Sequence, residues 1–239
     1  MKTLLYVCLL LPLLAGSQTK NVISSNRLFP KTDKVEEFEK ALASHAQKYH
    51  KGDWSWRVFD ILSGPDAGGY QITEGPNSWA QLDERNNISP EHTADFNKNV
   101  SPLTTDRSSS FFSVYRADLS TTELTAFTDK IAISHVFIKP GFGQAFEETI
   151  KKIKKAWEAG NQTVAVYEAS SSGPPQYIFV FRYKDGWKER DSSYRKPFKE
   201  RYNAVNGEDS FDTYLEAVQK YVDHSWGEML QIRKDLGSK

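Results

Sequence analysis

An internal sequence repeat is the feature that most constrains what this chain can fold into. Sliding the sequence by 108 residues aligns three pairs of landmarks: Phe38 with Phe146, Asp60 with Glu168, and Trp79 with Trp187. Near the ends the offset grows to 117, where "VYRADLS" (114–120) matches "QIRKDLG" (231–237). Because the matches keep a common order, they predict that one structural unit is repeated in the chain.

The first seventeen residues, "MKTLLYVCLLLPLLAGS", have the pattern of a secretory signal peptide. A basic start at Lys2 is followed by an apolar run from Leu4 to Leu14, which is shorter than the roughly 20 residues that a membrane span needs. We therefore predict an exported protein with a signal peptide over 1–17 and no stable membrane span. A lipoprotein anchor is the rival interpretation, but Cys8 lies inside the apolar run.

The composition of the remaining chain narrows the compartment and the partners. Cys8 is the only cysteine, so the mature chain has none, which favours a bacterial envelope, periplasmic or extracellular, over a eukaryotic secretory route. Without Lys2, 30 basic groups stand against 31 acidic groups, so nothing indicates a nucleic-acid partner. The length suits two halves, which we place at 18–120 and 121–239. The oligomeric state stays open.

Each half begins with a strand and an amphipathic helix. In the second half, "KIAISHVFI" (130–138) reads as a strand ended by Pro-Gly, and an apolar stripe follows at helical spacing: Phe142, Phe146, Ile150, Ile153 and Trp157. Gly160 is expected to cap that helix. The first half repeats the pattern with "NVISSNRLF" (21–29) and a helix entered near Thr32 or Asp33.

Two further strands, a helical segment and a last strand complete each half. The hairpin strands are "WSWRVFDIL" with "GYQIT" and "TVAVYEA" with "QYIFVFRY", and the helical segments cover about 77–100 and 186–224. "SFFSVYR" and "GEMLQIR" are the last strands. The order predicts an α+β fold of two ferredoxin-like β-α-β-β-α-β repeats, packed sheet to sheet as a pseudo-dimeric α/β barrel.

The strand, Lys-Pro-Gly turn and helix of "HVFIKPGFGQAFEETIKK", with the weaker "RLFPKTDKVEEFEKAL" in the first half, resemble the dimeric α/β-barrel proteins. That group includes antibiotic-biosynthesis-monooxygenase-like and NIPSNAP-like domains, here as a tandem duplication in one chain. The resemblance implies a cavity between the sheets. It also implies a choice among cofactor-free oxygenases, isomerases, haem enzymes and proteins without known activity, because the fold alone does not fix the function.

The histidines give no recognised metal-binding pattern in the sequence. His45 and His50 are five residues apart near the end of a helix, which separates them by about 140° around its axis and predicts two solvated side chains. His92 and His224 lie in polar segments, and no His-x-x-x-His or Cys-His spacing occurs. We therefore predict no metal site and no cofactor.

Alternation along the first strand of each half sets the expected ligand wall. Asn26 and Ser134 lie on the strand face with smaller, more polar side chains, which we assign to the cavity, whereas Ile131 and Ile133 are assigned to the helix interface. His135 then serves packing, although it is the one weak candidate for a catalytic base. We expect aromatic side chains close to the ligand: Trp54, Trp56 and Tyr167.

The resemblance also raises haem chemistry, for which members of the group are expected to use a strand Asn, a Trp and an axial His. "NRL" at 26–28 resembles the Asn position, but Trp54 and Trp56 lie on a different strand and no His follows them at a matching place. Asp60 and Glu168, equivalent under the repeat, are read as solvated strand ends. These observations predict no haem.

Three function classes remain from the sequence. The main prediction is an exported, non-catalytic protein that binds a small apolar or aromatic molecule between the two sheets. The alternative is a cofactor-independent monooxygenase or isomerase of the dimeric α/β-barrel type, with His135 as its base. A structural or interaction module is the third class.

Overall fold

The computed structural model describes residues 19–85, 88–170 and 173–239. The predicted signal peptide at 1–17 lies outside the described residues. Within these three ranges, no helix is both long enough and apolar enough to cross a membrane.

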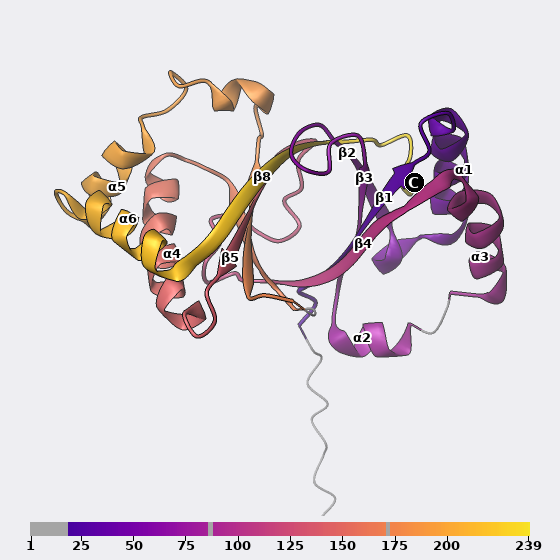
Figure 1. Cartoon of the computed structure of the whole chain (residues 1–239), viewed down its shortest axis with the longest axis horizontal. Helices are drawn as coiled ribbons and strands as arrows, with labels where there is room; N and C mark the ends of the chain where they lie inside the picture. Colours follow the sequence, from indigo (N-terminus) through magenta and orange to yellow (C-terminus); the bar gives the residue numbers. More distant parts are fainter. Residues whose placement is uncertain (1–18, 86–87, 171–172) are drawn as a thin grey trace, which may run out of the picture.

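Eight antiparallel strands close into one barrel in the order β1-β3-β2-β8-β5-β7-β6-β4. Their bounds are β1 Val22–Pro30, β2 Trp56–Ile61, β3 Tyr70–Asn77, β4 Thr104–Tyr115, β5 Lys130–Ile138, β6 Val164–Ala169, β7 Gln176–Arg182 and β8 Val222–Ile232. Each half contributes four neighbouring strands in the same relative order, β4-β1-β3-β2 and β8-β5-β7-β6. The long strands β4 and β8 run across the middle of the molecule (Figure 1). The two predicted hairpins, β2 with β3 and β6 with β7, are confirmed.

The helices form two groups on opposite sides of the barrel (Figure 1). One group holds α1 Val35–Tyr49, α2 Trp79–Glu84 and α3 Pro90–Asp95, and the other holds α4 Gly143–Ala159, α5 Phe198–Asn206 and α6 Ser210–Tyr221. Gly160 caps α4 as predicted. Helix α1 begins near the predicted entry, but capping by Thr32 or Asp33 is wrong, because Lys34 is the N-cap and its side chain makes no capping bond.

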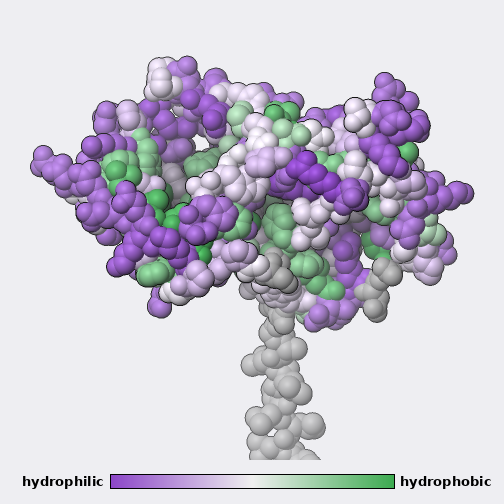
Figure 2. All heavy atoms as spheres, viewed as in Figure 1, coloured by the Kyte–Doolittle hydropathy of each residue, from purple (hydrophilic) through white to green (hydrophobic). Residues whose placement is uncertain are grey.

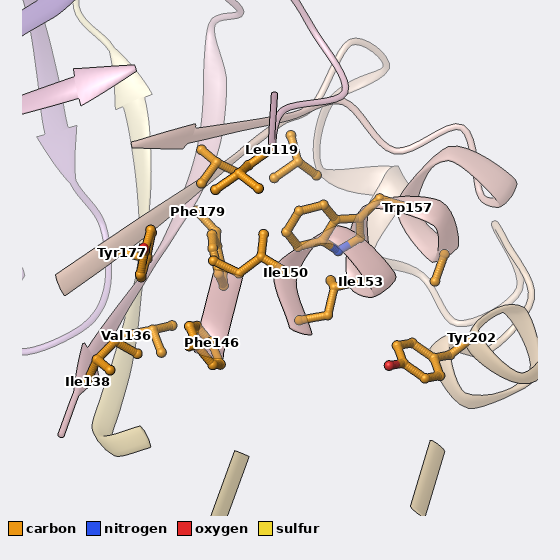
Figure 3. Packing of buried hydrophobic residues seen from close by; sticks show 13 residues of the cluster. Leu119, Val136, Ile138, Phe146, Ile150, Ile153, Trp157, Tyr177, Phe179 and Tyr202 are labelled. Carbon is orange, nitrogen blue, oxygen red and sulfur yellow. The ribbon is translucent and has the colours of Figure 1, made fainter. Parts of the chain in front are cut away.

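The apolar stripe of α4 packs against the outer face of the second-half strands, as its spacing predicts. Phe146, Ile150, Ile153 and Trp157 are buried, and Figure 3 shows them beside Val136 of β5. In the first half, α1 buries Phe38 and Leu42 against β2 and β3 in the same way. Hydrophilic side chains cover much of both helical ends on the face that Figure 2 shows.

The barrel interior is filled by the opposite faces of the strands. Ile131 and Ile133 point inward with Ile23 and Phe59, whereas Val136 and Ile138 contact the helices. The predicted assignment of strand faces is therefore wrong in both halves. The inward face of these strands carries bulky apolar side chains together with polar ones such as Ser25 and Arg57, so side-chain size and polarity do not identify the face that points inward.

Truncating the α4 stripe should cost much of the stability of the fold. Phe146 is 2% exposed, so Phe146→Ala should lower the free energy of unfolding by about 3–5 kcal/mol, through lost burial and the cavity left behind. Leu215 on α6 is 43% exposed, and Leu215→Ala should change the free energy of unfolding by less than about 0.5 kcal/mol. Urea unfolding measures both. Equal losses in the two variants would contradict this packing.

Candidate metal centre

Three histidines from separate segments meet between α1, α3 and the outer face of the first-half strands. His45 lies on α1, His50 directly follows that helix, and His92 lies on α3. The Nε2 atom of His50 is 3.4 Å from Nε2 of His45 and 3.2 Å from Nε2 of His92. One ligand nitrogen from each ring lies within 4.8 Å of the other two. The three rings therefore converge on one point.

Two of the three nitrogen separations match those of ligands around one metal ion. A tetrahedral ion with metal–nitrogen bonds of about 2.0–2.1 Å holds its ligand nitrogens about 3.3 Å apart. The two Nε2 separations at His50, 3.4 and 3.2 Å, agree with that value. The Nδ1 atom of His92 is buried without a hydrogen-bond partner. The ring can therefore rotate toward the other two histidines without breaking a hydrogen bond at that atom.

Carboxylates behind the rings fix which nitrogen carries the proton. His45 Nδ1 lies 2.8 Å from Oδ2 of Asp95, and His50 Nδ1 lies 3.2 Å from Oε2 of Glu74. Each Nδ1–H donates to its carboxylate, so each Nε2 keeps a lone pair that faces the centre of the cluster. Glu74 also accepts from Trp56 Nε1 at 2.9 Å. A carboxylate behind a histidine is the usual support of a metal-bound imidazole.

Burial keeps the three rings neutral. It lowers the pKa of His45, of His50 and of His92, because the charged imidazolium loses its hydration, and a neighbouring histidine lowers each pKa further. The Nε2 lone pairs of His45 and His50 face each other at 3.4 Å and repel. A bound cation removes that repulsion, so the arrangement favours a metal ion over an empty cluster.

A groove of about 440 Å³ opens beside the histidine cluster. His50, stacked on Trp56 at 3.6 Å between ring centroids, and His92 form its inner end. The strand wall is mostly polar, with Asn26 of β1 paired to Ser110 of β4. The rest of the lining is mixed: Arg27, Leu28, Ile72, Arg85, Phe96, Ser108 and Ser109. The groove offers both hydrogen-bonding and apolar contacts.

The predictions about His45 and His50 are wrong, since both side chains are fully buried and share this cluster. The angular separation of about 140° assumes that both residues are helical. Helix α1 ends at Tyr49, and the backbone of His50 is extended (φ −105°, ψ 102°), which turns its ring back toward His45. His92 joins because α3 packs on α1, a contact that no local spacing reports.

The structure separates the predicted ligand residues. Asn26 lines the groove and Trp56 packs on His50, whereas Ser134 lies on the outer face of the second half. Trp54 sits in a turn beneath Arg85, 4.9 Å from its guanidinium carbon. Of the five residues, Tyr167 alone lines the barrel interior. Their role in ligand binding stays a prediction.

His135 points into the barrel interior, but both of its ring nitrogens are occupied. Nε2 lies 2.8 Å from Oε1 of Glu228, and Nδ1 lies 2.7 Å from Nε2 of Gln176. The ring stacks on Trp226 at 3.9 Å, and Glu228 also pairs with Arg27. These contacts hold the ring in place and leave neither nitrogen free to act as a base without rearrangement.

Comparison with solved structures shows that the fold is shared with proteins described as monooxygenases and as anthrone oxidase-like. The chain is similar to a proposed monooxygenase from Lactobacillus acidophilus NCFM (14% identity, 92% of this chain and 96% of that one, TM-score 0.53). It is also similar to an anthrone oxidase-like protein (12%, 90% and 92%, TM-score 0.58) and to a proposed chlorite dismutase, TA0507 (10%, 90% and 96%, TM-score 0.53). No family profile and no curated protein sequence matches the chain.

These neighbours correct the main prediction of function. The chain was expected to be a non-catalytic binding protein, yet the proteins that share its fold are described as monooxygenases, an anthrone oxidase-like protein and chlorite dismutases. The prediction of a non-catalytic binding protein is therefore wrong, and these neighbours favour the alternative of an oxidative enzyme.

The metal-free protein should lose stability in mild acid. The unfolded chain titrates its histidines near pH 6.5, whereas the pKa values of His45, His50 and His92 in the fold are lower. As the pH falls from about 6.5 through the folded-state values, the unfolded state binds protons first and gains stability. Urea unfolding of metal-free protein at several pH values between 7.5 and 5 measures the loss.

Two variants separate this cluster from other sources of acid sensitivity. His50→Asn should lose less stability over the same pH range, because one buried titrating group is removed. His224→Asn should behave like the wild type, since His224 is exposed. A full acid loss in His50→Asn would show that the cluster does not set the pH dependence.

Proposed function

We propose that this protein is a metal-dependent oxidoreductase of the monooxygenase type, with one metal ion held by His45, His50 and His92. The observation that carries the proposal is the pair of Nε2–Nε2 separations, 3.4 and 3.2 Å, at rings backed by Asp95 and Glu74. The enzymatic class takes support from the fold shared with proteins described as monooxygenases.

The donor set favours copper. Three neutral imidazoles suit copper, zinc, nickel and iron, and among the divalent ions Cu²⁺ binds nitrogen ligands most tightly. Oxidative chemistry at the metal itself needs an ion that changes oxidation state, which zinc does not. Three protein ligands leave a fourth position open for substrate or dioxygen, as in catalytic metal sites generally.

The groove determines which substrates can reach that position. Asn26, Ser108 and Ser110 offer hydrogen bonds along one wall, while Leu28 and Phe96 offer apolar contact. A polycyclic ketone or phenol with an activated methylene group fits this lining. Its oxidation balances without a separate reductant: R₂CH₂ and O₂ give R₂C=O and H₂O, with the methylene carbon supplying all four electrons.

We also propose that the barrel arose by duplication of a ferredoxin-like unit, with copies at 18–120 and 121–239. The equal strand order of the halves supports this. So do two ion networks whose members lie at offsets of 107 to 117 residues. Each holds an arginine, three carboxylates and a tyrosine: Arg233, Glu39, Asp60, Asp235 and Tyr70 in one, and Arg116, Glu147, Glu168, Asp118 and Tyr177 in the other. Asp60 and Glu168 thus belong to separate ion networks.

Export through the segment at 1–17 remains part of the proposal. Its support is the basic start, the apolar run and the small residues before Gln18. Comparing the N-terminus of the protein purified from its own cell envelope with that of the full translation product tests it.

Metal analysis tests the proposed function first. Purified wild type should hold about one copper ion per chain, and His50→Ala should hold none. Asp95→Asn should lower the copper affinity about 10–100-fold, because it removes the support of His45. His224→Asn is the matched control and should bind copper as the wild type does.

Oxygen uptake with anthrone then tests the reaction, since one neighbour is described as anthrone oxidase-like. Copper-loaded wild type should consume oxygen, and the metal-free protein and His50→Ala should not. Activity that survives metal removal but is lost in His135→Ala would instead support the cofactor-independent alternative. Zinc as the tightly held native ion would contradict the oxidative role.

A further inference from the structure

We infer that the barrel interior contains a second site, for a small planar oxyanion, beside Arg57. A cavity of about 70 Å³ lies inside the barrel, and Arg57 of β2 is part of its wall. The neighbouring residue on β2, Trp56, points the other way and packs on His50 of the metal centre. The two sites therefore lie on opposite faces of the same strand, and this inference does not depend on the metal.

Arg57 is an arginine without a carboxylate partner among the described residues. Its Nη2 donates to the carbonyl oxygen of Gly75 at 2.7 Å, and its Nε is buried with no partner. The other arginines of the interior have more hydrogen-bond acceptors than Arg57. Arg27 pairs with Asp66 and Glu228, and Arg182 donates to three backbone carbonyls. A partly buried cation that lacks a counter-charge is costly, so Arg57, intermediate in exposure, favours a bound anion.

A second cation increases the need for negative charge. The guanidinium carbon of Arg57 lies 4.0 Å from the ring centroid of Phe127, and that of Arg182 lies 5.2 Å from the same ring. Burial, with Arg182 adding to it, lowers the pKa of Arg57 to about 10. Arg57 therefore still carries its charge at neutral pH, next to a second guanidinium.

The size and lining of the cavity define the anion. Because a water molecule needs about 10–15 Å³ of such space, there is room for roughly five waters, which suits a formate, acetate, nitrate or bicarbonate ion. The hydroxyl groups of Ser25, Thr73 and Ser113 can donate to its oxygens. The planar guanidinium fork matches two oxygens of one planar anion. Ile23 and Phe111 leave an apolar side for a methyl group.

Thermal unfolding at constant ionic strength tests this site. Replacing sodium chloride by sodium acetate or nitrate should raise the Tm of the wild type in a saturable way. Arg57→Met keeps the apolar stem but removes the charge, and it should show no such rise. Arg107→Met, which removes an exposed guanidinium from β4, should respond like the wild type.

Absence of an acetate or nitrate effect in the wild type would overturn the inference, and so would a full effect in Arg57→Met. If Arg57→Met does not fold, Thr73→Val and Ser113→Ala provide the same test. Each removes one donor to a charged group and should weaken anion affinity about tenfold. Unchanged affinity in both variants would equally overturn the inference.

Discussion

Closure of the barrel is the constraint on which the rest of the structure depends. Two four-stranded sheets would each expose two edges, and an exposed edge invites pairing with other chains. Here β2 joins β8 and β4 joins β6, through three residue pairs at each seam. Beside each seam an arginine joins a strand carboxylate to a helix carboxylate: Arg233 with Asp60 and Glu39, and Arg116 with Glu168 and Glu147. The seams and these ion pairs tie each helical end to the barrel.

The order of elements could be predicted from the sequence, whereas the orientation of strand faces and the histidine cluster could not. The stripe of Phe146, Ile150, Ile153 and Trp157 encodes a helix through local spacing alone. Which face of β5 points inward depends on barrel closure, and side-chain size misled the assignment of Ile131 and Ser134. The cluster depends on the extended backbone of His50 and on the docking of α3, both set by tertiary contacts.

The two halves use equivalent positions for different purposes. Under the 108-residue offset, His45 falls on Ile153, a core residue of the second half that Figure 3 shows packed beside Trp157. The second half keeps apolar packing at this place, and the first half buries a polar ring that Asp95 must hold. The apolar packing around Ile153 supports the second half, whereas the first half places polar histidine rings where a core would otherwise be apolar.

The pleat of β2 has a consequence for how the molecule handles charge. Trp56 and its partner Glu74 face the histidines, whereas Arg57 and its partner Thr73 face the interior. One layer of backbone thus divides two compartments that need not exchange solvent or solutes. An electric field still crosses it, since Glu74 on one side favours the charged form of Arg57 on the other. A unit change of charge on an ion held by the histidines would reach the interior as a change in potential, without any movement of the wall between them.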